Sequence, residues 1–178
     1  MDWILQSTRL GFREIVEHDF NDLCAILQNI EVMYAWEHAF SDVEVREWIA
    51  KNLDRYANEG FSFFAAIEKN TQELVGVIGP LLETVDGVSY IGIGYIVNKN
   101  FWGKGYALEG ANACMQFAFE ALHAEKVIAQ IRPGNLRSRK VAEKLGMKIE
   151  GEFTKQYRGV NMPHLIYSME RSVWLREG

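Results

Sequence analysis

The sequence predicts an α+β fold with a mixed, mainly antiparallel sheet that contains one parallel βαβ unit. In residues 88–132, a β-branched and aromatic run, a glycine turn, an amphipathic helix and a second apolar run follow one another without a gap. Apolar runs at 61–68 and 74–82, joined by the polar turn KNTQ, predict an antiparallel hairpin. No linker, repeat or low-complexity run divides the chain, so we expect a single domain over residues 1–178.

The N-terminal segment predicts a strand followed by a helix. Residues 9–15 alternate and place Leu10 and Phe12 on one face, as a half-buried strand requires. Asp19 is expected to cap the helix. Residues 31–40 have no clean period and predict a loop or a broken helix. The expected apolar stripe of the helix consists of Leu23, Ile26, Leu27 and Ile30.

A second helix begins at a capping box formed by Ser41 and Glu44, and Gly60 lies where a glycine would end it. In the hairpin, Pro80 cannot donate a ladder hydrogen bond, so we expect it at a bulge, an edge or a strand end. Asp86-Gly87 is a hairpin signal that leads into the next strand. The expected buried face of the helix consists of Val45, Trp48, Ile49, Leu53 and Tyr56.

Residues 88–97 predict a largely buried strand, and the next helix begins at the turn Gly103-Lys104-Gly105. The first amides of a helix lack intrahelical partners and glycine lets an anion approach them closely, so this turn is a candidate phosphate site. A plain strand-to-helix turn is the alternative. The apolar face of this helix is expected to contain Leu108, Ala111, Met115, Ala118, Phe119 and Leu122.

The C-terminal part predicts three strands and one helix. Residues 126–132 are expected to lie parallel to 88–97, because a single helix connects the two in a right-handed crossover. A helix over about 137–145 follows, and a further strand begins at the sequence KIEGEF. The last strand is expected at about 164–170.

The composition argues against several classes of function. A formal charge of −5 and a pI near 5.4 disfavour a general nucleic-acid or anionic-membrane binder, because such proteins carry a basic face. Cys24 and Cys114 lie in apolar helical patterns without metal-ligand spacing, so we expect reduced core residues, no metal site and a cytoplasmic protein. No leader-like N-terminus and no apolar stretch of about 18 residues are present, so we expect no membrane segment.

Two segments, FWGKGYALEG and PGNLRSRKVAEKLGM, resemble the GNAT superfamily of N-acetyltransferases, and the resemblance covers roughly residues 8–170. The pyrophosphate loop of that family reads Gln or Arg, two residues, Gly, one residue, then Gly or Ala. Residues 100–105, NFWGKG, match it except in the first position. The branch most resembled includes the ribosomal-protein N-terminal acetyltransferases that act on alanine or serine.

The resemblance implies acetyl-CoA as the acetyl donor, with its pyrophosphate on the amides of about residues 103–107. It also implies that the strand at 95–97 splays from its neighbour and pairs with pantetheine, leaving an amide near Tyr95 or Ile96 to stabilise an oxyanion. Asn135 matches a family residue beside the cofactor, although a turn or cap role is the alternative. The expected cofactor-binding residues are Tyr95, Ile96, Val97, Gly103, Lys104, Gly105, Tyr106, Ala107, Asn135, Arg137 and Ser138.

The implied reaction is direct acetyl transfer to a primary amine, through a tetrahedral intermediate and without a metal. The amine belongs to a protein or peptide N-terminus or to a small molecule. Gly92 and Ala142 stand where many members have a glutamate base and a tyrosine acid. Ser138, three residues after the loop asparagine, is the first candidate acid, with an ordinary helix serine as the alternative. Tyr157, in the loop after the sixth predicted strand, is the second candidate.

The acceptor site is expected in the irregular segment, with Glu31, Tyr34, Trp36 and His38 as substrate-binding residues. Filling the core is an equal alternative for Tyr34, Trp36 and Phe40. The candidate bases are Glu31, Glu37 and His38, each of which has a structural alternative. Glu109 is expected to stabilise the start of its helix rather than to act in chemistry. A basic cluster that binds CoA phosphates or forms a solvated helix face consists of Arg132, Arg137, Arg139 and Lys140.

The expected partners are acetyl-CoA and an amine acceptor, with neither direct nucleic-acid binding nor membrane association, and a homodimer is left open. The alternative function is a catalytically weak acetyl-CoA-binding sensor or interaction module. The residues at positions 92 and 142 motivate this alternative, because both lack the side chains that many members use.

Overall fold

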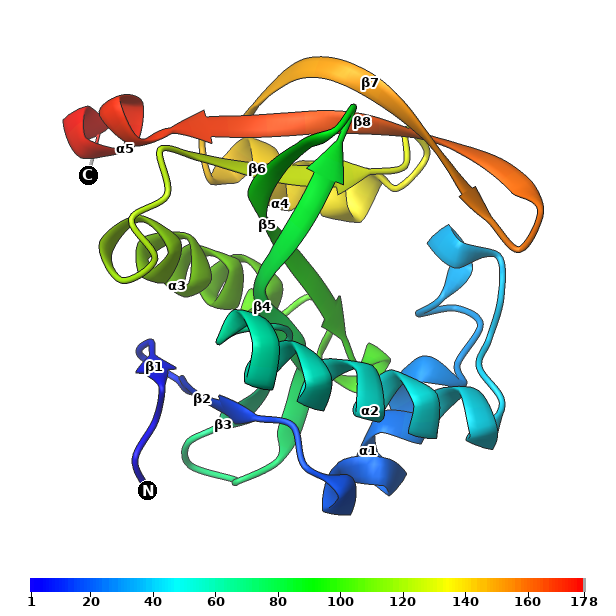
Figure 1. The fold of residues 1–178 in the computed structure, drawn as a ribbon. Helices are drawn as coiled ribbons and strands as arrows, with labels where there is room; N and C mark the ends of the chain where they lie inside the picture. Colours follow the sequence, from blue (N-terminus) through cyan, green and yellow to red (C-terminus); the bar gives the residue numbers. More distant parts are fainter. Residues whose placement is uncertain (178) are drawn as a thin grey trace.

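The computed structural model describes residues 1–177 and contains an eight-stranded sheet in the order β1-β2-β3-β4-β5-β6-β8-β7 (Figure 1). Adjacent strands are antiparallel except β5 and β6, which are parallel. The predicted mixed, mainly antiparallel sheet is therefore confirmed. The strands are β1 (Leu5–Gln6), β2 (Leu10–Glu14), β3 (Phe64–Glu68), β4 (Leu74–Val85), β5 (Val88–Val97), β6 (Lys126–Ile131), β7 (Lys148–Tyr157) and β8 (Val160–Glu170).

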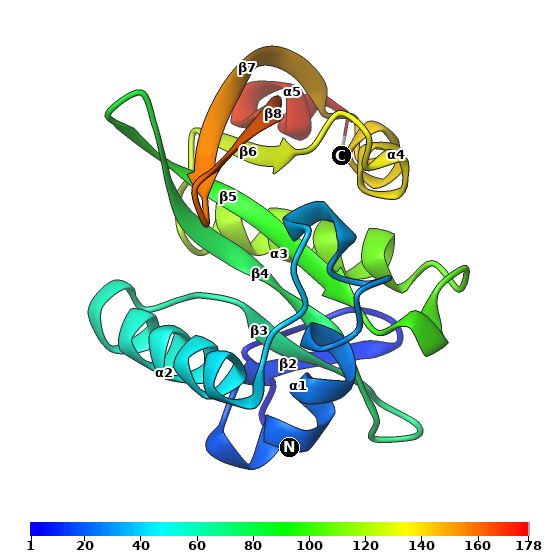
Figure 2. The same cartoon turned by 90° about the vertical axis from the view of Figure 1, so that its right-hand side faces the viewer.

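The helices cover the two faces of the sheet unequally (Figure 2). Side chains of α1 and α2 pack with β3 and β4 on one face, while α3 packs against the other face together with α4. On the face of α1 and α2, the β6–β8 half of the sheet carries only a small apolar cluster of Val85, Ile128 and Ile166. The α-helices are α1 (Phe20–Leu27), α2 (Asp42–Glu59), α3 (Tyr106–Glu120), α4 (Leu136–Lys144) and α5 (Arg171–Glu177).

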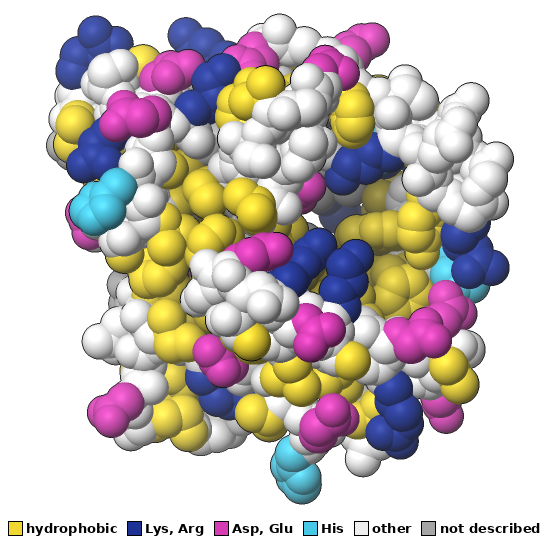
Figure 3. All heavy atoms as spheres, in the orientation of Figure 1, with side chains coloured by type: hydrophobic (Ala, Val, Ile, Leu, Met, Phe, Trp, Pro, Cys, Tyr) yellow, Lys and Arg dark blue, Asp and Glu magenta, His cyan; other side chains and the backbone are white. Residues whose placement is uncertain are grey.

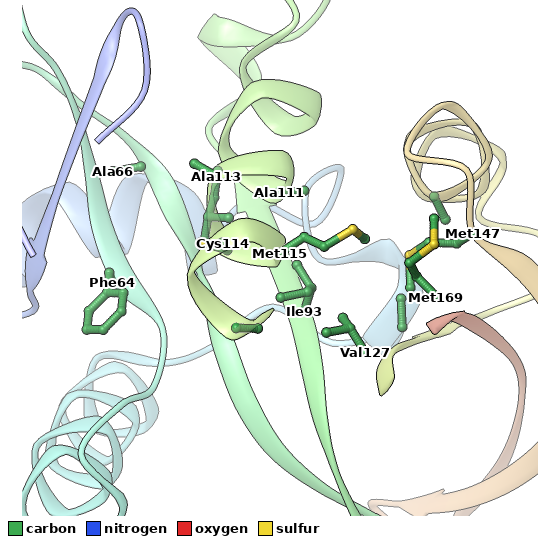
Figure 4. Close-up of a cluster of buried hydrophobic side chains, with 14 of the residues drawn as sticks. Phe64, Ala66, Ile93, Ala111, Ala113, Cys114, Met115, Val127, Met147 and Met169 are labelled. Atoms are coloured by element: carbon green, nitrogen blue, oxygen red, sulfur yellow. The ribbon is translucent and has the colours of Figure 1, made fainter. Parts of the chain in front are cut away.

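The larger core lies between α3 and the sheet. Figure 4 shows Ala111, Cys114 and Met115 of α3 beside Ile93 of β5. Cys114 is fully buried, whereas Cys24 is only partly buried, and both thiols are free. Burial of this kind stabilises α3 as a rigid element, and the rigid helix fixes the position of the glycine turn that precedes it.

The start of the chain differs from the prediction in three respects. A two-residue strand, β1, precedes the predicted one and pairs with β2. Asp19 occupies the N-cap of α1 without a side-chain cap bond, because its carboxylate binds Arg13 and accepts a hydrogen bond from the backbone of Val16. Ile30 lies beyond the helix and is 54% exposed, so it is not part of the buried stripe. The irregular segment contains a single short 3-10 turn, η2 (Tyr34–Trp36).

The middle of the chain follows the prediction closely. The Ser41 and Glu44 capping box is formed, and Gly60 ends α2 with φ 87°. Only residues 64–68 of the first predicted hairpin run form a strand, and they pair antiparallel with β4. Pro80 pairs with β5 beyond the last residue of β4 that pairs with β3, so it lies where β4 is an edge. Asp86 and Gly87 both have positive φ, as a tight hairpin turn requires.

The C-terminal region is more regular than predicted. Tyr157 was expected in a loop, but it ends β7 and pairs with Val160 of β8 across the turn Arg158-Gly159. The last strand therefore begins at residue 160 rather than 164. α5 was not predicted, and it packs on the core through Trp174, which stacks on Phe119 with ring centroids 5.0 Å apart.

Candidate active site

The parallel pair β5 and β6 separates soon after it forms. The two strands pair only at Ile91 with Val127 and at Gly92 with Ile128. Beyond this point, residues 93–97 of β5 continue to pair with β4, but they have no strand partner on their other side within the part of the chain that the structure describes. The Val97 carbonyl oxygen accepts from Nε1 of Trp102 at 2.9 Å, and the other backbone groups on that edge of β5 are available to an extended ligand.

The glycine turn opens α3 toward the gap between the two strands. Gly103 and Gly105 have φ values of 76° and 80°, a region that disfavours other residues. A β-carbon on Gly103 would meet nothing within 4 Å, so the turn borders open space. Gly105 is the N-cap of α3 and supplies no side-chain cap, which leaves the first amides of the helix free for an anion.

A cavity of about 560 Å³ extends from this turn along the free edge of β5. Its cations are Arg137, Lys140 and Lys144, and none of the described residues that line it is acidic. Arg137 lies over the ring of Trp102 at 3.9 Å, so the aromatic ring positions the guanidinium beside the cavity. This cavity therefore combines a free strand edge, an uncapped helix start and positive charge.

A smaller cavity of about 250 Å³ adjoins the larger one at Tyr95 and Ile96 of β5. Its walls come from β4, β5, β6, β7 and β8 and from the irregular segment, and its charged groups include Glu83, Arg132 and Lys155. Figure 3 shows this face of the molecule hollowed below the β7–β8 hairpin, with hydrophobic and basic side chains around the hollow. The unequal covering of the sheet by α1 and α2 leaves room for this cavity.

The two cavities meet at Trp36, Tyr95, Ile96, Asn135 and Ser138, which line both. The Tyr95 hydroxyl donates to the carbonyl oxygen of Ser138 at 2.8 Å, which joins β5 to the start of α4. Burial raises the pKa of Tyr95, so this hydroxyl stays protonated and continues to donate at neutral pH. The junction is therefore held in place by a hydrogen bond between the two elements that flank the gap.

The family described as "Acetyltransferase (GNAT) domain" matches residues 9–148. The chain belongs to the GNAT family of acetyltransferases. This result confirms the resemblance identified from the glycine turn and from the segment that begins at Pro133.

Known relatives agree with this assignment. The chain is 31% identical to the uncharacterized protein YkkB of Bacillus subtilis, over 92% of this chain and 93% of the relative. A GNAT-family acetyltransferase from Bacillus anthracis has a similar structure, with a TM-score of 0.79, 26% identity and coverage of 94% of this chain and 98% of the other. A ribosomal L7/L12 alpha-N-protein acetyltransferase in complex with coenzyme A shares the fold, with a TM-score of 0.77, 18% identity and coverage of 97% and 99%. The chain is also 29% identical to the uncharacterized N-acetyltransferase YnaD of Bacillus subtilis, over 85% of this chain and 86% of the relative. Together with the family match, this relative shows that the protein is an N-acetyltransferase.

Most residues expected to bind the cofactor line the larger cavity of this acetyltransferase. Ten of the eleven lie there, and the exception is Lys104, whose ammonium lies 5.4 Å from the centroid of the Phe101 ring. Asn135 caps α4 by accepting from the Ser138 amide at 3.2 Å, and it also accepts from the Tyr34 hydroxyl at 2.5 Å. Its cap role and its position beside the cavity therefore coexist.

The expected acceptor residues divide into two groups. Trp36 lines both cavities and Tyr34 lines the larger one. Glu31 and His38 lie outside the residues that line either cavity, because Glu31 forms an ion pair with Lys99 and His38 lies 2.7 Å from Glu44. Glu37 also lies outside them. The irregular segment has no periodic pattern from which these side-chain orientations could be predicted.

The smaller cavity contains a carboxylate that sequence reasoning missed. An ideal β-carbon on Gly92 would lie 2.6 Å from Cγ of Glu83 and 3.5 Å from its Oε1, so Glu83 of β4 covers the glycine. Lys155 lies 3.8 Å from the other carboxylate oxygen of Glu83. The Asp86-Gly87 turn fixes the β4–β5 register that brings these strands together, so the hairpin register was the available signal.

Two further titratable groups line the smaller cavity, on β7 and β8. Nδ1 of His164 lies 2.9 Å from the carbonyl oxygen of Met162, so a proton on Nδ1 leaves Nε2 as an acceptor. Burial lowers the pKa of His164, which favours the neutral imidazole at pH 7. Burial raises the pKa of Tyr157, which keeps its phenol protonated.

Glu109 and Arg9 form a polar cluster beside the glycine turn. The Glu109 carboxylate accepts hydrogen bonds from Ser7 and from the backbone and side chain of Arg9 at 2.6–2.7 Å. Burial alone would raise the pKa of Glu109, but these hydrogen bonds lower it below its usual range. Arg9 also lies over the Tyr106 ring at 4.1 Å and was not identified from the sequence.

The basic cluster of the C-terminal half is divided among three places. Arg137 and Lys140 line the larger cavity, and Arg132 lines the smaller one. Arg139 instead donates to the Tyr167 hydroxyl and to the carbonyl oxygen of Pro133, both at 3.0 Å.

Within residues 1–177, no group of three or more His, Cys, Asp or Glu side chains is arranged to hold a metal ion. No helix of this described part is long and apolar enough to cross a membrane.

Proposed function

We propose that this N-acetyltransferase binds acetyl-CoA in the larger cavity and transfers the acetyl group to a primary amine held in the smaller cavity. The observation that carries the proposal is the junction of the two cavities at Tyr95, Asn135 and Ser138. The acceptor amine belongs to a small molecule or to a protein or peptide N-terminus. Residues 1–178 form a single acetyltransferase domain in this proposal.

The larger cavity has features that fit acetyl-CoA. The space beside Gly103 is open, and the uncapped start of α3 offers amides to a pyrophosphate. Arg137 and Lys140 supply positive charge for phosphates. The free edge of β5 offers backbone groups that suit the amide-containing pantetheine arm. Arg9, beside Gly105, is a further candidate for contact with the phosphates.

Acetyl-CoA, when bound, supplies a thioester whose carbonyl carbon a neutral amine attacks directly, so that a C–N bond forms and the C–S bond breaks through a tetrahedral intermediate. In this proposal a backbone amide near Tyr95 or Ile96, residues that line both cavities, stabilises the oxyanion. The junction position of Ser138 suits a donor to the departing thiolate sulfur. Tyr157 lines only the smaller cavity and is therefore the second candidate for this acid.

We assign the general base to Glu83. Its carboxylate lies over Gly92, where the resemblance places a glutamate in many members of the family. Glu83 would take the proton that the amine loses, directly or through water, and release it to solvent after product leaves. His164 is the alternative base, because its Nε2 is free to accept.

The proposal is tested by following thiol release from acetyl-CoA with a panel of alkylamines, amino acids, amino acid amides and short peptides. Turnover that depends on both the amine and acetyl-CoA is expected. Calorimetric binding of acetyl-CoA without turnover on any amine would instead support the acetyl-CoA-binding sensor. Failure to bind acetyl-CoA would refute the assignment of the larger cavity.

A further inference from the structure

The smaller cavity contains polar atoms that lack partners. Both polar atoms of the Gln130 side chain, Oε1 and Nε2, are buried and make no hydrogen bond within residues 1–177, and the same is true of Nε of Arg132. Both side chains line the smaller cavity. Buried polar groups are nearly always paired in folded proteins, so three unpaired atoms on two side chains that line one cavity indicate groups that a ligand satisfies.

The local structure holds the two side chains in place. Gln130 lies on β6 and pairs with Ile166 of β8, and Arg132 follows two residues later, so the two side chains point to the same face. Nη1 of Arg132 donates to the carbonyl oxygen of Ala35 at 2.9 Å, which anchors the guanidinium while Nε remains unpaired. The rigid strand and this anchor preorganise the unpaired donors.

The unpaired atoms comprise two kinds of donor and one acceptor. Nε2 of Gln130 and Nε of Arg132 donate, whereas Oε1 of Gln130 accepts. A carboxylate offers two oxygens to the donors, and an adjacent amino group offers a proton to the acceptor. An α-amino acid carries both groups on one carbon, so it can satisfy all three atoms together.

The charge and size of the cavity favour the same class of ligand. Of the described residues that line it, Glu83 is the one carboxylate, against the two cations Arg132 and Lys155. Lys155 lies 3.8 Å from Glu83, and Arg132 lies 3.7 Å from Glu37, whose side chain is 59% exposed and outside the cavity lining. The guanidinium of Arg132 therefore has no carboxylate partner among the described residues that line the cavity, which suits an acceptor that carries a carboxylate and disfavours a polyamine. The volume of about 250 Å³ lies below the range of roughly 300–1,000 Å³ typical of sites for drug-sized ligands, so a small acceptor is favoured.

We infer that the acceptor of this enzyme is a free α-amino acid, whose carboxylate is bound by Gln130 and Arg132 while Glu83 takes the proton from its amino group. The inference rests on the proposed function, because it concerns the acceptor of that same site. Acetyl transfer then forms the N–C bond of an N-acetyl amino acid, breaks the C–S bond and releases the thiol of CoA. Gln130 and Arg132 are specificity-determining residues in this assignment.

The first test compares acceptors that differ in one group. Thiol release is measured with the twenty L-amino acids, their carboxamides, the corresponding amines without a carboxylate, and dipeptides. At least one amino acid is expected to have a kcat/KM tenfold or more above its carboxamide, mainly through a lower KM. Transfer that favours a carboxamide, a plain amine or a peptide over every free amino acid would overturn the inference, although the proposed acetyl transfer would stand.

The second test removes the unpaired groups. Gln130→Leu and Arg132→Met are expected to lower kcat/KM for the amino acid at least tenfold more than they lower kcat/KM for a plain alkylamine. Gln116→Leu, on the exposed side of α3, is the matched control and should change neither. Gln130→Leu should also raise the Tm, because it replaces a buried unpaired amide with an apolar group. Equal losses for both acceptors would assign Gln130 a merely structural role.

A binding measurement keeps the inference testable if turnover is slow or a variant fails to fold. In wild-type protein saturated with CoA, the ¹⁵N-detected signals of the Gln130 side-chain amide and of Arg132 Nε–H are followed as amino acids are added. Shifts of both signals with an amino acid, and not with its carboxamide, are expected. The absence of shifts with all twenty amino acids would overturn the inference independently of catalysis.

Discussion

Glu83 of β4 lies across Gly92 of β5 so closely that a β-carbon on the glycine would come within 2.6 Å of the glutamate Cγ. The two residues are neighbours on one face of the hairpin, since Gly92 pairs with Leu81 and Glu83 lies two residues further along β4. A glycine at position 92 therefore permits a carboxylate at the floor of the smaller cavity. Gly92 of β5 has no carboxylate of its own, but Glu83 of the neighbouring strand β4 provides one.

Replacing Glu83 by glutamine should lower kcat/KM about 100-fold or more, because a general base contributes a factor of this order and the amide cannot accept the proton. The Kd of acetyl-CoA should stay within about twofold, since Glu83 does not line the larger cavity. Steady-state kinetics and calorimetry measure the two quantities. Glu120→Gln on the exposed part of α3 is the control. If His164→Gln proves the more damaging change, the base is His164.

Replacing Gly92 by alanine should displace the Glu83 side chain and reduce kcat toward the value of Glu83→Gln. The flexible side chain can move aside, so the free energy of unfolding should change by no more than about 1 kcal/mol. In the Glu83→Gln background, Gly92→Ala should lower kcat little further, because both changes act on the Glu83 carboxylate. Gly151→Ala, where a β-carbon meets nothing within 4 Å, is the matched control. Additive losses of kcat in the double variant would show that the two residues act independently.

Replacing Gly103 by alanine should raise the Kd of acetyl-CoA about tenfold or more, because the new methyl group would enter the open space beside the turn. Its positive φ also costs stability, by about 1–2 kcal/mol for a non-glycine residue. Gly60→Ala isolates this cost, since Gly60 has φ 87° and open space around it but ends α2 instead. Equal Kd values of acetyl-CoA for the two variants would argue against phosphate binding at the glycine turn.

Replacing Ser138 by alanine should lower kcat by at least about tenfold while changing the Kd of acetyl-CoA less, because a proton donor to the leaving sulfur acts in the transition state. Tyr157→Phe should have a smaller effect on kcat, since Tyr157 lines only the smaller cavity. Single-turnover kinetics distinguish the two. A larger effect for Tyr157→Phe would transfer the acid role to the tyrosine.

Replacing Asp19 by asparagine should destabilise the protein by about 1.5–3 kcal/mol at pH 7, as expected for a charged group that loses hydrogen bonds to Arg13 and Val16. Burial raises the pKa of Asp19, but the bonds from Arg13 and Val16 outweigh burial and lower it. The stabilisation of the fold that this carboxylate contributes is therefore complete above its unfolded pKa of about 3.9, and it is lost as the pH falls through the lower pKa of the folded state.

Urea unfolding between pH 7 and pH 3 measures this effect. The difference between wild type and Asp19→Asn should shrink as the pH falls below about 4. Asp54→Asn, on the exposed face of α2, should show no such trend and serves as the control. A difference that is independent of pH would show that the carboxylate charge is not the source of the stability.

Local features of the sequence determined most of the fold. The capping box at Ser41, the turn at Asp86-Gly87 and the glycines at 103 and 105 each depend on residues close together in the chain. Interactions of this kind depend on short patterns of residue type, and these patterns predicted the main helices and hairpins correctly. The two-residue β1 and the C-terminal α5 are too short for a clear period, which explains why they were missed.

The sequence by itself also determined the family. It predicted the free strand edge and the helix start at which we propose the cofactor binds, because both act through backbone groups whose positions follow from local structure. Only the tertiary structure decided which side chains line the smaller cavity. Glu83, Gln130 and His164 meet there from three strands that are distant in the chain, whereas Glu31 and His38 turn to other partners. Which side chains come together in this way depends on strand register and on the unequal covering of the sheet by helices, and no local sequence pattern predicts either.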